Sequence, residues 1–166
     1  MNTARFWIRK LRLKKHTEGG YYREAYRSDE TISGTALPRR YKGKRAFSTS
    51  IYFLLKGCEI SRLHRLKSDE IWHFYAGSSL TIHVIDPKGK YSRITLGSDI
   101  GKKQSFQHLA RRNCWFGATV DNPEGFSLVG CTVSPGFDFA DFEMAEQNKL
   151  IAMFPRYDSI IGKLTR

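Results

Sequence analysis

A histidine and a glutamate six positions apart are the residues of this chain best suited to chemistry. His64 and Glu70 belong to two short apolar stretches, 58–66 and 70–76, which a polar turn separates. Because side chains alternate along a β-strand, His64 shares a face with apolar residues and Glu70 shares one with two aromatic residues. Neighbouring strands would bring the imidazole and the carboxyl into one apolar interior. Such a pair suits proton transfer near neutral pH, and a buried structural hydrogen bond is the alternative.

The same alternation assigns the remaining residues of the first stretch to two faces. Arg62 has the parity of His64, so we expect it inside. Glu59, Ser61 and Arg65 have the opposite parity. We therefore expect these three side chains on the outer, solvent-facing side of the strand.

Short stretches rich in Tyr, Phe, Ile, Val and Thr recur along the chain, and turn residues bound each of them. They cover residues 21–27, 47–55, 58–66, 70–76, 80–86, 91–96, 105–110, 114–120 and 126–133. Strands this short, repeated about every 8–12 residues, predict an all-β antiparallel sandwich or barrel. We expect a single domain over 1–166, with an N-terminal helix at about 3–15, the barrel at about 21–134 and a helical tail at about 138–166. The polar segment 28–45 is expected to form a mobile loop.

The central segment resembles the first motif of the cupin superfamily, a group of small jelly-roll barrels. A glycine, His64, Glu70 and a second glycine follow one another at the spacing of that motif. The usual cupin metal site adds a second histidine from this motif and a third from a later motif. Leu66 and Phe116 stand at those two positions in this chain. The resemblance therefore implies no metal site and no cofactor.

Longer stretches resemble one cupin subfamily that is catalogued as a domain of unknown function. They cover residues 16–28, 48–55, 63–75 and 128–139, which together span most of the chain. The resemblance implies a double-stranded β-helix (jelly roll) with short flanking helices. It also implies a homodimer, since related cupins pair.

Several further residues are candidates for the wall of a small-molecule pocket. Arg23 and Arg62 could clamp a phosphate or carboxylate through the planar guanidinium. The aromatic candidates are equally suited to filling a core, and they are Trp72, Phe74, Trp115 and Phe137. By similarity to metal-free cupin epimerases, His64 would remove a proton next to a carbonyl and Glu70 would orient it or share its charge. Tyr52 would return the proton.

Composition restricts partners and location. The chain has 28 Lys and Arg against 16 Asp and Glu, a net charge of +12 that favours anionic partners. No nucleic-acid-binding signature accompanies the charge, so specific nucleic-acid binding is not expected. No apolar run is long enough to span a membrane. Three widely spaced cysteines and the lack of a secretory signal favour a cytoplasmic setting. The basic, amphipathic N-terminus also resembles an organelle transit peptide, and that alternative stays open.

These observations lead to one functional expectation with two alternatives. We expect a protein that binds a small anionic or carbohydrate-like metabolite in its barrel, with isomerase or epimerase chemistry if it is an enzyme. The first alternative is a non-catalytic binding or storage-type cupin whose pocket is filled by side chains. The second is a nucleic-acid binder that uses the basic surface.

Overall fold

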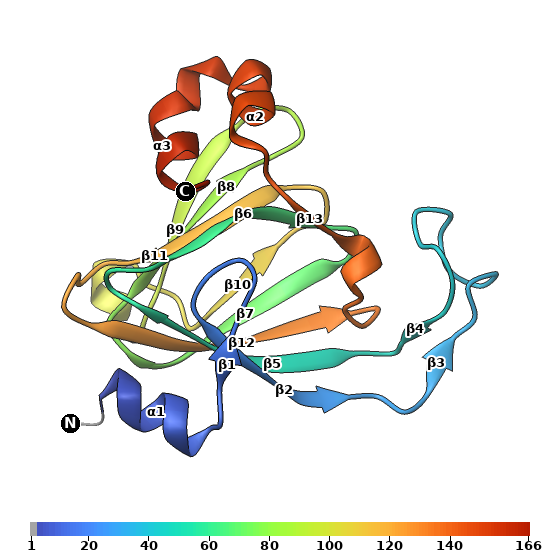
Figure 1. Ribbon diagram of the computed structural model, residues 1–166, viewed down its shortest axis with the longest axis horizontal. Coiled ribbons are helices and arrows are strands. Elements are labelled where there is room, and N and C mark those ends of the chain that lie inside the picture. The colour runs from blue at the N-terminus through green and yellow to red at the C-terminus, as the bar shows by residue number, and fades with distance from the viewer. Residues whose placement is uncertain (1–2) are drawn as a thin grey trace.

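Two antiparallel sheets form the body of the molecule in the computed structural model, which describes residues 3–166 (Figure 1). The larger sheet runs in the order β1 (Lys14–Lys15), β2 (Tyr21–Arg27), β5 (Thr49–Lys56), β12 (Phe126–Ser134), β7 (Asp69–Gly77) and β10 (Gln107–Ala110). The smaller sheet runs in the order β13 (Phe142–Met144), β6 (Ile60–Leu66), β11 (Trp115–Val120), β8 (Leu80–Ile85) and β9 (Tyr91–Leu96). All nine strands expected from the sequence are present, with ends shifted by no more than two residues. The all-β jelly-roll prediction is confirmed.

The main apolar core draws side chains from both sheets. Phe53, Trp72 and Val129 come from the larger sheet and meet Ile82 and Phe116 of the smaller one. All five are at most 1% exposed, and each fully buried side chain of this size contributes roughly 1.5–3 kcal/mol. The core fixes the spacing of the sheets and so holds the strands that carry His64 and Glu70.

The N-terminal helix is shorter than the expected 3–15. Helix α1 (Ala4–Lys10) begins at Thr3, whose hydroxyl accepts the Phe6 N–H at 3.2 Å, and Leu11 caps its end. Arg12 then adopts a left-handed backbone with φ 53°, which turns the chain into β1. The apolar face of α1 packs against the outer side of the larger sheet.

The C-terminal tail is helical as expected, but it begins with a strand. β13 pairs with β6 and adds an edge to the smaller sheet before α2 (Gln147–Met153) and α3 (Asp158–Lys163) begin. Leu150, Ile161 and Leu164 are at most 1% exposed and pack on Leu63 and Trp115. The single-turn 3-10 helices are η1 (Ile100–Lys102), η2 (Phe139–Asp141) and η3 (Pro155–Tyr157). No helix within residues 3–166 combines the length and the apolar character needed to cross a membrane.

Segment 28–45, expected as a mobile loop, forms an arm that has no regular structure between residues 33 and 44 and is tied to the body at Arg45. Its ends form the two-stranded sheet of β3 (Thr31–Ile32) and β4 (Arg45–Ala46), which projects beside the body in Figure 1. The Arg45 guanidinium donates to both oxygens of Asp141, at 2.6 and 2.8 Å, and both side chains are buried. This ion pair ties the arm to η2.

A β-bulge in β6 changes which of its residues face inward. Across from β11, His64 pairs with Phe116 and Ser61 pairs with Ala118, so two residues of β6 lie opposite Gly117 alone. The extra residue reverses the alternation, and Ser61 becomes fully buried on the same side as His64. The expectations that Ser61 faces outward and that Arg62 shares the face of His64 are both wrong for this reason.

Candidate functional site

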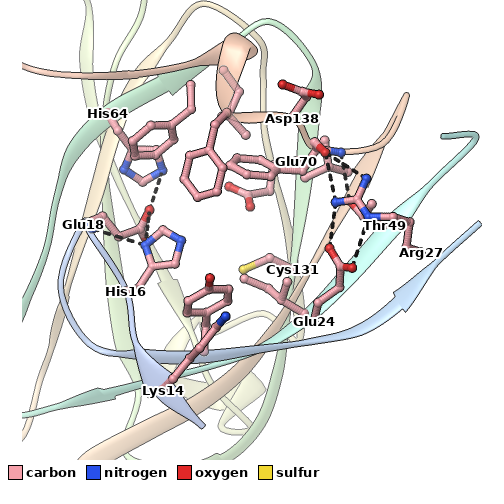
Figure 2. Close-up of a pocket in the computed structure, with 17 residues that line it drawn as sticks. Lys14, His16, Glu18, Glu24, Arg27, Thr49, His64, Glu70, Cys131 and Asp138 are labelled. Atoms are coloured by element: carbon pink, nitrogen blue, oxygen red, sulfur yellow. Dashed lines mark hydrogen bonds and ion pairs between the residues drawn. The ribbon is translucent and has the colours of Figure 1, made fainter. Parts of the chain in front are cut away.

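A cavity of about 410 Å³ opens between the sheets at the end where η2 lies. Its apolar lining includes Tyr22, Ile51, Phe137 and Phe142, and its polar lining includes Lys14, His16, Glu18, Glu24, Arg27, His64, Glu70, Cys131 and Asp138. Figure 2 shows His16, Glu18 and His64 together on one wall and the Glu24–Arg27 pair on the opposite wall. Both side chains of that pair are more than 40% exposed, so the pair lies at the solvent side of the cavity.

The hydrogen bonds of His64 fix its orientation. Nδ1 lies 2.7 Å from the backbone carbonyl oxygen of Arg62, and Nε2 lies 3.3 Å from Oε2 of Glu18. The ring also packs on Phe116, with 4.3 Å between the ring centroids. Glu18, rather than Glu70, is therefore the carboxyl that orients this imidazole.

These contacts also show which atoms of His64 and Glu18 carry a proton. A carbonyl oxygen only accepts, so Nδ1 of His64 must carry a proton. Nε2 of neutral His64 then carries no proton, so a hydrogen bond between Nε2 and Oε2 of Glu18 requires the proton to be on Glu18. Burial raises the pKa of Glu18 and lowers the pKa of His64, so both shifts favour a carboxylic acid that donates to a neutral imidazole.

Glu18 is held at its other oxygen by the bulge residue. The Ser61 hydroxyl donates to Oε1 of Glu18 at 2.9 Å, and both groups are buried. The Glu18 backbone N–H donates to Nδ1 of His16 at 3.2 Å, which places the proton of neutral His16 on Nε2. Burial lowers the pKa of His16 as well. The wall thus carries a carboxyl between two imidazoles, with Oε2 of Glu18 3.5 Å from Nδ1 of His16 and 3.3 Å from Nε2 of His64.

Glu70 is the second buried carboxyl of the cavity. Its Oε2 accepts the indole N–H of Trp72 at 3.0 Å. Burial raises the pKa of Glu70 to about 7, the Glu18 carboxyl adds to the rise, and His64 opposes it. At neutral pH this carboxyl is close to equally populated in its acid and base forms, which is the condition that favours general acid–base catalysis. The Cys131 thiol lies beside it, and burial followed by Glu70 raises the pKa of that thiol.

Three of the nine site residues expected from the sequence line the cavity: His64, Glu70 and Phe137. Tyr52 does not. It lies on the outer side of β5, where its ring meets Tyr75 at 6.1 Å and Arg23 at 5.4 Å. The placement of Tyr52 beside His64 is corrected accordingly. Arg23 follows Tyr22 in β2, so its side chain points to the outer face as well.

The other expected ligand-binding residues are also outside the cavity. Trp72 is 1% exposed in the main core and touches the site only through its hydrogen bond to Glu70. Phe74 packs against the same core. Trp115 lies on the far side of the smaller sheet, under the Arg65 guanidinium. Arg62 turns outward at the bulge and donates to the Thr17 carbonyl.

His16 and Glu18 were not expected as site residues. Both precede β2 in a segment without strand periodicity, which gives no face to assign. One signal was available, because His16 and Glu18 belong to the first stretch that resembles the cupin subfamily. A histidine and a glutamate two positions apart in a stretch of that kind are therefore the signal that points to this part of the site.

The residues at the family's metal positions do not fit a metal ion. Leu66 and Phe116, which replace two histidines, are 3% and 0% exposed and offer no donor atom. Within residues 3–166 no group of three His, Cys, Asp or Glu side chains is arranged to hold a metal. We derive no chemical step through a metal.

Comparisons with known proteins give one family and solved structures that cover nearly all of the chain. The model of the Cupin superfamily (DUF985) matches residues 5–145. The crystal structure of a protein from Shewanella oneidensis has 43% sequence identity and a TM-score of 0.90, and the match covers 100% of this chain and 99% of that one. A hypothetical protein from Leishmania major has 37% identity and a TM-score of 0.89, with 99% of both chains covered.

More distant structures share the fold alone. Oxalate decarboxylase from Bacillus subtilis has 17% identity and a TM-score of 0.55, over 90% of this chain and 36% of that one. A search of curated proteins found no match.

Proposed function

The chain belongs to the Cupin superfamily (DUF985), and because titratable side chains line its cavity, we propose that it binds a small carbohydrate-like metabolite there and moves a proton on it. The observation that carries the proposal is the pairing of two buried carboxyls with two imidazoles around about 410 Å³ of open space. A storage-type cupin was expected to have a pocket filled by side chains. The open cavity favours binding instead.

The charge of the lining favours an uncharged ligand. Four carboxyl side chains line the cavity, whereas Lys14 and Arg27 are its cations. Arg27 and Glu24 neutralise each other, with Nη2 2.7 Å from Oε2. Glu18 is un-ionised, which leaves Lys14 against Asp138 and the partly ionised Glu70. The net charge of +12 therefore lies elsewhere, and the anionic ligand expected from composition gives way to a neutral one. Hydroxyl groups suit the carboxyl acceptors, and the faces of Phe137 and Phe142 suit the apolar side of a sugar ring.

The proton transfer uses Glu70 as the base and the Glu18–His64 pair as the acid. In its ionised form Glu70 accepts a proton from the carbon next to a carbonyl group. The proton shared by Glu18 and His64 moves to the carbonyl oxygen, which leaves an enediol, neutral Glu70 and an ionised Glu18. Glu70 then returns its proton to the adjacent carbon, and the hydroxyl on the carbon that lost its proton gives its own proton to Glu18, which yields the aldose–ketose isomer and restores every group.

Hydrogen exchange with solvent tests the proposal. We would incubate the protein with unphosphorylated aldoses and ketoses in D₂O and follow the signals of the protons next to the carbonyl by NMR. We expect catalysed deuterium incorporation for at least one sugar, and Glu70→Gln should slow it about a hundredfold or more. Glu143→Gln is the matched control, because Glu143 pairs with Arg65 on the surface. Exchange that is equally fast in Glu70→Gln, or sugars that bind without exchange, would contradict the proposal.

A further inference from the structure

A second hollow lies on the other side of the segment that carries His16 and Glu18. It is an open cleft of about 620 Å³ between residues 15–20, the start of β6 and the end of the C-terminal tail. His16 and Glu18 line both this cleft and the cavity. The segment is therefore a wall shared by the two hollows.

Two consecutive residues of β6 assemble the cleft. The Arg62 backbone N–H donates to the Glu18 carbonyl at 2.8 Å, and its guanidinium donates to the Thr17 carbonyl. The Leu63 backbone N–H donates to the Leu164 carbonyl at 2.8 Å. Leu164 is fully buried, which fixes the tail beside β6, and Lys163 and Arg166 line the same cleft as Arg62.

The charge of the cleft is unbalanced. Its cations are Lys15, Arg62, Lys163 and Arg166. Lys15 is neutralised by Glu59, with 2.8 Å between Nζ and Oε1, and the raised pKa of Glu18 reduces the charge of the remaining carboxyl. Across residues 3–166 no carboxylate forms an ion pair with Arg62, Lys163 or Arg166. Three cations without an ion-pair partner thus line one concave surface, an arrangement that an anion stabilises.

We propose that this cleft is a binding site for a phosphate group, either inorganic phosphate or the phosphoryl group of a small ester. The planar guanidinium of Arg62 is held in place by Thr17 and keeps further N–H groups for a second acceptor. Lys163 and Arg166 add charge from the C-terminal tail, which lines the same cleft. Arg62 was a candidate phosphate clamp from the sequence, and the structure assigns that role to a place outside the cavity. The inference does not depend on the proposed proton transfer.

Titration calorimetry with inorganic phosphate tests the site. We expect saturable binding of one phosphate per chain to the full-length protein. The double variant Lys163→Ala/Arg166→Ala should weaken it about tenfold or more. The matched control, Arg9→Ala/Lys10→Ala on α1, removes the same charge from exposed residues that do not line the cleft and should bind as the wild type does. Absence of saturable binding, or an equal loss in both double variants, would overturn the proposal.

NMR locates the bound phosphate, and a second ligand distinguishes inorganic phosphate from a phosphate ester. His16 lies in the shared wall, so its imidazole signals should shift at the phosphate concentrations that give half-saturation in calorimetry. Binding with unmoved His16 signals would place the anion elsewhere and overturn the assignment. Glycerol phosphate is the second probe. Tighter binding than inorganic phosphate would identify an ester as the ligand, and equal or weaker binding would identify the free anion.

Discussion

The carbonyl oxygen of Arg62 sets the tautomer of His64. It lies 2.7 Å from Nδ1 and can only accept, so Nε2 is left to share a proton with Glu18. We predict that ¹⁵N NMR at pH 7 shows His64 neutral, with the proton on Nδ1. Glu18→Gln should keep this tautomer, because an amide N–H can replace the acid as donor to Nε2. An imidazolium, or a proton on Nε2 in neutral His64, would contradict the assignment.

The raised pKa of Glu70 makes folding stability depend on pH. Below its ordinary value of 4.5 the carboxyl is protonated in both the folded and the unfolded chain. Between pH 4.5 and about 7 the unfolded chain releases the proton while the folded chain keeps it, so stability is lost as pH rises. The loss is on the order of 3 kcal/mol at 1.36 kcal/mol per pKa unit.

Glu70→Gln isolates this effect, since both histidines remain in the variant. We predict that the free energy of unfolding of the wild type, measured in urea, falls relative to that of Glu70→Gln as pH rises from 5 to 7. A difference that stays constant over this range would mean that Glu70 titrates normally.

Among the elements, the bulge in β6 matters most to the site. The bulge turns Ser61 inward, where its hydroxyl donates to Glu18, and it requires a glycine at position 117 on the facing strand β11. A Cβ atom at Gly117 would lie 2.6 Å from the Ser61 carbonyl oxygen. Gly117→Ala should therefore destabilise the fold by about 1–3 kcal/mol. Gly162→Ala in α3 is the control, because its nearest contact would be 3.7 Å away and alanine favours the helix. Equal stabilities of the two variants in urea would contradict this account of the bulge.

The Arg45–Asp141 ion pair joins the arm to η2, which borders the cavity. Asp141→Ala leaves a buried guanidinium without its partner and should cost about 3–5 kcal/mol. Replacement of both residues, as Arg45→Met/Asp141→Leu, should recover part of that loss because no unpaired charge remains. Chemical denaturation would measure both. A single variant as stable as the wild type would show that the pair does not anchor the arm.

Local pattern predicted the long strands and little of what connects them. Stretches rich in aromatic and β-branched residues, bounded by turn residues, located all nine, including β2 and β9 to the residue. The two- and three-residue strands β1, β3, β4 and β13 exist through tertiary pairing and have no pattern of their own. The alternation of side chains predicts the inward position of His64 and the wrong face for Ser61. The bulge adds a residue to β6 and reverses the alternation, and nothing in the sequence of β6 signals it. Arg45 and Asp141 are 96 positions apart, which no local pattern relates.

At the scale of the whole molecule, charge is unevenly distributed. The net charge of +12 suggested an anionic ligand in the barrel, yet the cavity is lined by four carboxyl groups and two cations, and three cations without an ion-pair partner line the outer cleft. A total charge cannot reveal such a separation, since it depends on which strand ends meet. The homodimer, the cytoplasmic location and the absence of nucleic-acid binding stay predictions.

The cavity holds a carboxyl, Glu70, whose pKa of about 7 makes the proposed proton transfer possible at neutral pH. NMR titration of the protein with ¹³C-labelled glutamate side chains tests this pKa most directly, with Glu70→Gln used to assign the Glu70 signal. We predict half-protonation of Glu70 at about pH 7. A midpoint at the ordinary value of 4.5 would contradict the claim, because Glu70 would then be fully ionised at neutral pH and a weak base.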